Sequence, residues 1–220
     1  MSKRLSIGAL ALTVAALALV AAGCGGSKKS SSGGGGGGSA AGKVTALPAS
    51  SCAKLESKAT PDLLMTSDLP MQGSSRTQTV QMVQAIKYVL DQRGWKAGKY
   101  NIGFQVCDDA TSQAGKWDSG KCNSNAQAYA GNSSVIGVIG TFNSGCAAIE
   151  IPVLNQAAGG AIAMVSPANT FPCLTVHPGC DKSEPDKYYP TGKRNYARVV
   201  RYDAYQAAIA SSITSAACAA

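Results

Sequence analysis

The sequence is poor in charge and in aromatic side chains, and its positive excess is spread along the chain. Charged residues make up 15% of the 220 residues and aromatic residues 6%. Twenty Lys and Arg stand against 12 Asp and Glu, and beyond the first four residues the only adjacent basic pairs are Lys28-Lys29 and Lys193-Arg194. A protein that follows a nucleic-acid backbone needs a concentrated basic stripe with interleaved aromatics. We therefore expect no nucleic-acid partner.

The motifs of several enzyme classes are also missing. The chain has one histidine, His177, and no CxxC pair, which argues against a zinc site. The segment 67–73 contains a single glycine, so it lacks the GxGxxG pattern of dinucleotide-binding loops. The turn Asn143-Ser144-Gly145 lacks the first glycine of a hydrolase nucleophile elbow. We expect a protein that is not an enzyme and that needs no metal or other cofactor.

Hydrophobic residues, by contrast, are as frequent as in ordinary globular proteins. They make up 45% of the chain, which excludes disorder throughout. Residues 51–220 remain to fold once the N-terminal segments described next are set aside. That length is enough for one or two compact domains.

The first 23 residues predict a lipoprotein signal. Lys3 and Arg4 form a positive start, and residues 5–20 are an uncharged run that is short for a membrane span. The end of this run, Val20-Ala21-Ala22-Gly23-Cys24, resembles a bacterial lipobox. We expect Cys24 to carry lipid and to anchor the protein at the extracytoplasmic face of the cell membrane. A plain secretory signal, cut at another alanine, is the alternative.

Residues 24–50 predict a flexible linker. The segment is rich in Gly and Ser and contains six consecutive glycines at 33–38. Such a composition cannot bury apolar surface and behaves as a flexible coil. The linker would hold a folded domain near the membrane without fixing its orientation.

Eight cysteines in an exported protein suggest disulfide bonds. Cys173 and Cys180 bracket a short loop with Pro and Gly and are the first predicted pair. Cys107 and Cys122 flank a polar segment and are a second candidate pair. The sequence does not decide the pairing of the remaining three: Cys52, Cys146 and Cys218.

The region after residue 60 alternates between strand and helix patterns. Apolar runs predict strands at 63–66, 102–106, 135–139, 161–165 and 196–200. Helical spacing predicts helices at 75–93, 116–130, 146–157 and from 204 onward, the first with a capping box formed by Ser75 and Gln78. The continuous apolar run 135–139 suggests a strand buried on both faces. The fold class is therefore α/β, with a doubly wound parallel sheet.

In such a sheet, ligands meet the loops at the carboxyl ends of the strands. Here those loops are 67–73, 107–110, 141–145 and 166–170, which are rich in hydroxyls and amides and poor in general bases. Asp108 and Asp109 are adjacent, so we expect them to cap the following helix and not to form an acid/base pair.

The order of these motifs resembles a known family. The motifs are Asp108-Asp109-Ala110, Val138-Ile139-Gly140, Ser166-Pro167-Ala168-Asn169-Thr170, and Arg198 followed by Asp203 and Gln206. Together with the lipoprotein start they resemble leucine-binding-protein-type receptors, the substrate-binding components of amino-acid ABC importers, across roughly residues 54–206. The resemblance implies a type I periplasmic-binding fold, a branched-chain amino acid or similar small polar solute as ligand, and an ABC permease as partner.

The resemblance also implies a ligand site. Ser144 would donate its hydroxyl to a ligand carboxylate, Ala168 would offer its carbonyl to the ammonium, and Thr170 its hydroxyl and N–H. Asn143 and Asn169, in the same loops, complete the candidate set. Neutral dipoles and a helix N-terminus can stabilise a zwitterion without a buried full charge. A helix cap at Ser144 and a turn residue at Thr170 are the structural alternatives.

One departure concerns the end of the chain. The family's Gln-Gly is Gln206-Ala207 here, and 13 residues follow. The family has a second lobe of comparable size, so residues 51–220 are expected to form the N-terminal lobe only, of a truncated or fragmentary receptor with the second lobe missing. An extracytoplasmic ligand-sensing domain and a cell-surface lipoprotein outside transport are the alternative functions.

Overall fold

A computed structural model describes residues 44–218 of the chain. The predicted signal segment 1–23, Cys24 and the linker up to residue 43 lie outside these residues, so the structure does not test them. Within the described part of the chain, no helix combines the length and the apolar character that crossing a membrane requires.

A six-stranded sheet with the order β2-β3-β1-β6-β7-β8 organises the fold. Its strands are β1 (Leu63–Leu69), β2 (Lys96–Ala97), β3 (Tyr100–Asp108), β6 (Val135–Gly140), β7 (Ala163–Ser166) and β8 (Tyr196–Arg198). All neighbours pair in parallel except β2 and β3, which form an antiparallel edge hairpin. A separate two-stranded sheet consists of β4 (Ala110–Thr111) and β5 (Lys116–Trp117).

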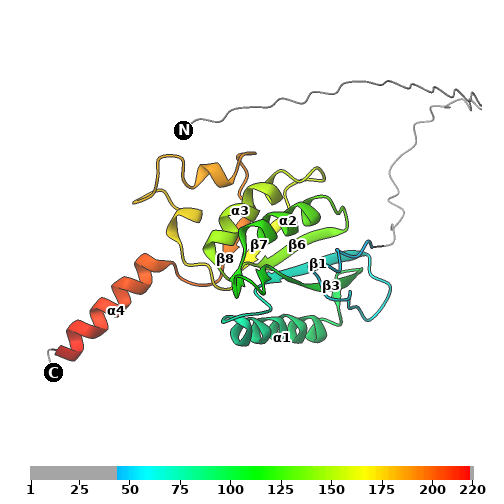
Figure 1. Cartoon of the computed structure of the whole chain (residues 1–220), viewed down its shortest axis with the longest axis horizontal. Helices are drawn as coiled ribbons and strands as arrows, with labels where there is room; N and C mark the ends of the chain where they lie inside the picture. The colour runs from blue at the N-terminus through cyan, green and yellow to red at the C-terminus, as the bar shows by residue number, and fades with distance from the viewer. Residues whose placement is uncertain (1–43, 219–220) are drawn as a thin grey trace, which may run out of the picture. The chain divides into compact units, whose positions relative to one another are not determined.

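Helices cover both faces of the main sheet. The helix α1 (Arg76–Gln92) lies on one face, and α2 (Ser119–Ala130) and α3 (Ser144–Asn155) lie on the other (Figure 1). Two short 3-10 helices, η1 (Pro172–Leu174) and η2 (Asp186–Tyr188), lie between β7 and β8, and α4 (Asp203–Cys218) follows β8. The predicted doubly wound α/β fold is confirmed, and the strand order reverses between β1 and β6.

The core is formed where β1, β6 and β7 meet α3. Leu64, Val138, Ile151 and Met164 are all buried there. The prediction that the strand at 135–139 is buried on both faces was wrong, because Ile136 remains 41% exposed. The described side chains of α4, up to residue 214, are exposed.

The first helix begins one residue later than the sequence predicted. Ser75 occupies the N-cap position of α1, but its side chain makes no capping hydrogen bond, so the predicted capping box with Gln78 is not formed. The helix also ends one residue earlier than predicted, at Gln92, and Gly94 adopts a φ of 61°, a left-handed conformation that glycine accommodates without strain.

The described residues contain three disulfide bonds. One joins Cys173 to Cys180, as the sequence predicted. The predicted Cys107–Cys122 pair was wrong: Cys107 is bonded to Cys52, and Cys122 to Cys146.

Tertiary contacts explain both of the other pairings. The segment before β1 runs antiparallel along β3, which places Cys52 directly opposite Cys107. Cys122 lies on α2 and Cys146 on α3, and these two helices pack against each other on the same face of the sheet. The spacing of cysteines in the sequence carries no information about either contact.

Candidate functional site

The candidate site lies where β6 and β7 end. Ser144 is the first residue of α3 and follows the N-cap residue Asn143. The Ser144 hydroxyl oxygen accepts hydrogen bonds from the backbone N–H groups of Thr170 and Phe171, both at 3.2 Å. The structure therefore brings together the N-terminus of α3 and the loop after β7, as the sequence predicted.

The loop after β7 is held by hydrogen bonds to the loop after β6. Ser166 donates its hydroxyl to the Thr141 carbonyl at 2.8 Å and accepts from the backbone N–H groups of Asn169 at 2.8 Å and Ala168 at 3.1 Å. These bonds fix the backbone of Ala168, so the direction of its carbonyl is set before any ligand arrives.

The side chain of Asn169 is turned into the protein and away from solvent, whereas a ligand contact would have to be accessible. Its side chain is fully buried, donates to the Thr141 carbonyl at 3.0 Å and accepts from the Tyr196 hydroxyl at 2.9 Å. The side chain of Asn169 therefore shapes the loop from inside. Asn143 is half-buried, and its Oδ1 atom is buried with no protein partner among the described residues.

Arg198, at the end of β8, also binds the loop after β7. Its guanidinium donates to the carbonyl oxygens of Phe171 at 2.7 Å and Asn169 at 3.3 Å, and to the hydroxyl of Thr175 at 2.7 Å. A planar guanidinium can serve several acceptors at fixed angles. Arg198 is thus committed to protein groups.

A cavity of about 560 Å³ adjoins the loop. It is lined by Gln78, Gln81, Met82, Ala85, Phe142, Pro167, Ala168, Thr170, Val200 and Gln206. None of these ten residues is charged, so a ligand here would meet amides, hydroxyls, backbone groups and apolar side chains. Two of the predicted site residues, Ala168 and Thr170, line the cavity directly.

The contribution of α1 to this cavity was missed by the sequence analysis. Gln78, Gln81, Met82 and Ala85 follow the i, i+3, i+4, i+7 spacing of one helix face. That spacing is visible in the sequence, but Gln78 was assigned to a capping box. The packing that turns this face toward the loops after β6 and β7 is not encoded in the local pattern.

Asp108 and Asp109 do not cap the following helix, contrary to the prediction. Asp108 accepts hydrogen bonds from the backbone N–H of Met71 and the side-chain amide of Gln72, both at 2.8 Å, and so fixes the loop after β1. The N-terminus of α2 is capped instead by Asp118, which accepts from the Lys121 N–H at 2.9 Å. The helix begins later than predicted, which brings Asp118 to the N-cap.

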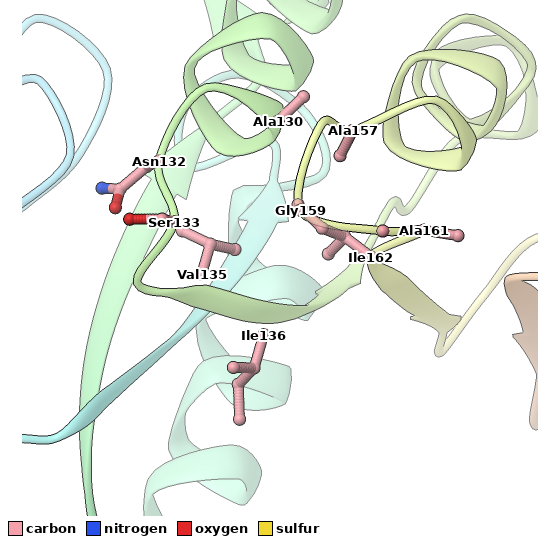
Figure 2. Close-up of a pocket in the computed structure, with 10 residues that line it drawn as sticks. Ala130, Asn132, Ser133, Val135, Ile136, Ala157, Gly159, Ala161 and Ile162 are labelled. Carbon is pink, nitrogen blue, oxygen red and sulfur yellow. The ribbon is translucent and has the colours of Figure 1, made fainter. Parts of the chain in front are cut away.

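A second cavity, of about 320 Å³, lies at the opposite ends of the strands. Its lining includes Asn132 and Ser133 before β6, Ile136 on β6, and Gly159 and Ala161 before β7 (Figure 2). These are the amino ends of the parallel strands. Ligands of such sheets bind at the carboxyl ends, so we assign the candidate site to the cavity beside Thr170.

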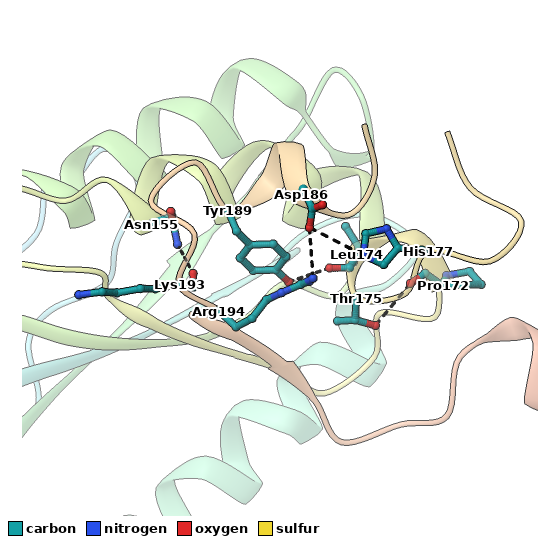
Figure 3. Close-up of polar contacts among 9 residues, drawn as sticks. All are labelled: Asn155, Pro172, Leu174, Thr175, His177, Asp186, Tyr189, Lys193 and Arg194. Carbon is teal, nitrogen blue, oxygen red and sulfur yellow. Dashed lines mark hydrogen bonds and ion pairs between the residues drawn. The ribbon is translucent and has the colours of Figure 1, made fainter. Parts of the chain in front are cut away.

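The one histidine belongs to a surface network. His177 is 62% exposed and lies 3.9 Å from Asp186, whose carboxylate also contacts Arg194 at 3.4 Å (Figure 3). The Arg194 guanidinium stacks 4.2 Å from the ring centre of Tyr189, and Tyr189 donates its hydroxyl to the Leu174 carbonyl at 2.7 Å. Among the described residues, no hydrogen bond or ion pair joins His177 to Ser144.

Comparisons with known proteins give matches among solved structures. No family model and no curated protein matches the chain. A leucine-binding protein from Thermotoga maritima is 16% identical with a TM-score of 0.49, over 66% of this chain and 34% of that one. A putative branched-chain amino acid ABC transporter from Rhodospirillum rubrum is 18% identical with a TM-score of 0.49, over 64% and 34%.

A third match, an ABC transporter substrate-binding protein from Desulfitobacterium hafniense, is 21% identical with a TM-score of 0.46, over 64% of this chain and 34% of that one. At such identities the likeness concerns the fold alone. The chain spans about a third of the length of these solved structures. The proteins of known structure that this chain resembles thus include ABC-transporter substrate-binding proteins, some of them of the leucine and branched-chain amino acid type.

Proposed function

We propose that this lobe binds a small zwitterionic solute of the amino-acid type at the carboxyl ends of β6 and β7. The observation that carries the proposal is the joining of Ser144, at the N-terminus of α3, to the Thr170 loop beside an uncharged cavity. The N–H groups and dipole of a helix N-terminus favour a carboxylate. The oxygen of Ser144 already accepts two N–H bonds, so its own proton remains to be donated to the ligand.

The ammonium group of the solute would be bound by neutral acceptors. The carbonyl of Ala168 and the hydroxyl of Thr170 lie at the cavity, and no carboxylate lines it. Dipoles can satisfy a zwitterion without the cost of a buried unpaired charge. Because the lining has no charged side chain, we expect a solute with a neutral side chain, such as leucine, to bind better than glutamate or lysine.

The cellular role that we propose is delivery of this solute to an ABC permease at the extracytoplasmic face of the membrane, with the chain tethered through lipid on Cys24. The sequence around Cys24 and the three disulfides support this placement, because disulfides persist in oxidising compartments outside the cytoplasm. The proposal includes no catalytic step.

An NMR titration of the purified, isotope-labelled chain with leucine tests the binding site. We expect amide shifts concentrated at Ser144 and at 168–171, with smaller shifts for glutamate at the same concentration. Shifts concentrated instead around Asn132 and Gly159 would place the ligand in the opposite cavity and contradict the proposal. No shifts at the solubility limit of leucine would do the same.

A further inference from the structure

Three acidic side chains lie in the interior of the lobe without a basic partner. Asp68 is the last residue but one of β1, Asp109 follows β3, and Glu150 lies in the second turn of α3; all three are fully buried. None of the ion pairs found in the described residues includes any of them. Buried charges in proteins are normally paired or neutralised.

Most of their oxygens also lack hydrogen-bond donors. Among the described residues, Oδ2 of Asp68, both carboxylate oxygens of Asp109 and Oε2 of Glu150 have no partner. Of the other oxygens, Oδ1 of Asp68 accepts the amide N–H of Asn125 at 3.0 Å, and Oε1 of Glu150 lies 3.4 Å from the sulfur of Cys146. Orphaned buried oxygens of this kind indicate that something further, a proton or an ion, satisfies them.

The three groups surround the disulfide between α2 and α3. One oxygen of Asp68, one of Glu150 and the sulfur of Cys146 lie within 4.8 Å of one another, and so do one oxygen of Asp109 and the sulfurs of Cys122 and Cys146. Both sulfurs belong to a disulfide and carry no charge. The sulfur of Cys146, not an open space, therefore lies beside all three carboxyl groups, which disfavours a shared cation.

Protons on some of these carboxyl groups would supply the hydrogen-bond donors that the cluster lacks. Two carboxylates can only accept hydrogen bonds, whereas a protonated Glu150 can donate to Asp68. Burial, strengthened by the charge of Asp68, raises the pKa of Glu150 well above its usual range, and burial raises the pKa of Asp109 to about 8. The pKa of Asp68 is raised by burial too, but hydrogen bonds involving Glu150, Asn125 and Tyr129 oppose that shift.

We propose that Asp68, Asp109 and Glu150 form a proton-holding cluster that seats α3 against β1 at acidic and neutral pH and loosens this contact as its protons leave. The groups that face it are Asp68 from β1, Asp108 beside Asp109 at the end of β3, Asn125 and Tyr129 from α2, and Glu150 from α3. All of them are acidic or neutral. Nothing in this set can neutralise a deprotonated cluster.

The direction of the pH effect follows from the raised pKa values. Below about pH 4, both the folded and the unfolded chain hold the proton of Asp109, and its contribution to stability is complete. As the pH rises from about 4 to 8, the unfolded chain releases this proton while the folded chain keeps it. Stability therefore falls with rising pH, and Glu150, whose pKa burial raises as well, adds to the fall.

Infrared spectroscopy of the purified chain tests the protonation directly. At pH 7 we expect the carbonyl absorption of protonated carboxylic acids, which exposed Asp and Glu do not give at this pH. The band should weaken in Glu150→Gln and in Asp109→Asn, and should persist in the control Asp91→Asn, which changes an exposed acid on α1. A spectrum without this band at pH 7 would overturn the proposal.

Urea unfolding between pH 5 and 9 tests the consequence. For each proton released on unfolding, the unfolding constant rises up to tenfold per pH unit. We expect this slope in the unaltered chain and in Asp91→Asn, and a flatter slope in Glu150→Gln, whose amide still donates to Asp68. Asp109→Asn provides a second test if one variant fails to fold. Equal slopes in all variants would contradict the proposal.

A cation is the competing explanation, and calcium chloride is the probe. If calcium raises the unfolding midpoint of the unaltered chain at pH 7.5 but not that of Glu150→Gln, a metal ion neutralises the cluster and the proposal fails. We expect calcium to shift both proteins equally, by the small amount that ionic strength alone produces.

Discussion

At the residue scale, the hydroxyl of Ser144 joins the start of α3 to the loop after β7. Its oxygen accepts hydrogen bonds from the N–H groups of Thr170 and Phe171. The helix-cap alternative was wrong, because Asn143 occupies the N-cap position of α3 and the bonds to Ser144 come from another loop. The ligand contact that the sequence predicts for Ser144 stays a prediction.

The Ser144→Ala variant tests both the contact with the loop after β7 and the proposed ligand contact. Loss of the acceptor leaves two backbone N–H groups without a partner, so we expect the free energy of unfolding to fall by about 1–3 kcal/mol. Ligand-induced shifts at 168–171 should weaken as well. Urea unfolding and NMR titration measure the two effects. Ser212→Ala, which removes an exposed hydroxyl on α4, is the control.

A second prediction at the residue scale concerns Arg198. Its guanidinium donates to three carbonyl oxygens and one hydroxyl from one planar group. Lysine keeps the charge but cannot span the same acceptors. We expect Arg198→Lys to destabilise the chain by about 1–3 kcal/mol and to speed hydrogen exchange at 169–175. Exchange equal to that of the unaltered chain in this loop would show that Arg198 does not order it.

The sequence could identify some site residues and not others. Ser144, Ala168 and Thr170 stand next to predicted strand ends, so their approach follows from the parallel sheet alone. Asn169 stands between two of them and differs because Tyr196, 27 residues further on, turns its amide inward. The buried carboxyl cluster depends on three elements meeting, so no local pattern marks Asp68 or Glu150.

At the scale of elements, the sequence could predict the alternation of strands and helices because each apolar run is short and the first helix, α1, has a clear helical period. The boundaries of α1 and β6 follow the prediction to within a residue or two. The disulfide bonds between different elements could not be predicted from the sequence. Cysteine spacing found the local Cys173–Cys180 loop, but Cys122–Cys146 requires knowledge that α2 packs on α3.

The three disulfides allow a prediction about their relative effects. Cys122 and Cys146 are 24 residues apart, whereas Cys173 and Cys180 are seven apart. In the chain-entropy model, closing the longer loop stabilises by about 1 kcal/mol more. We therefore expect the Cys122→Ala/Cys146→Ala variant to lose about 1 kcal/mol more stability in urea than Cys173→Ala/Cys180→Ala, beyond any cavity effect.

Peptide mapping without reduction checks the pairing itself. We expect linked peptides for Cys52 with Cys107 and for Cys122 with Cys146. A peptide in which Cys107 is linked to Cys122 would contradict the packing of the segment before β1 along β3.

At the scale of the whole molecule, the proposed placement at the membrane rests on the sequence before the described residues. If Cys24 carries lipid, Cys24→Ser should move the protein from the membrane fraction to the soluble fraction. The comparison is made in cells by fractionation and immunoblotting, with Cys218→Ser as the control. Retention of Cys24→Ser in the membrane fraction would show that another feature anchors the chain.

The affinity that we expect of this chain for the proposed solute also belongs to the scale of the whole molecule. The cavity is lined by loops and helices of one sheet, so a bound amino acid would remain in contact with water on one side. Each hydrogen bond made there contributes only about 0.5–1.5 kcal/mol, and these bonds must offset the entropy lost on association.

With only three or four such bonds proposed, at Ser144, Ala168 and Thr170, we expect weak binding, with a Kd on the order of 1 mM or weaker, which corresponds to a binding free energy no more favourable than about −4 kcal/mol. NMR titration with leucine should therefore require millimolar concentrations to reach saturation. Thr170→Val should weaken binding by up to about tenfold, because it removes one hydroxyl while keeping the side-chain volume. Micromolar binding by this chain would mean that the ligand is enclosed by more of the protein than the loops after β6 and β7.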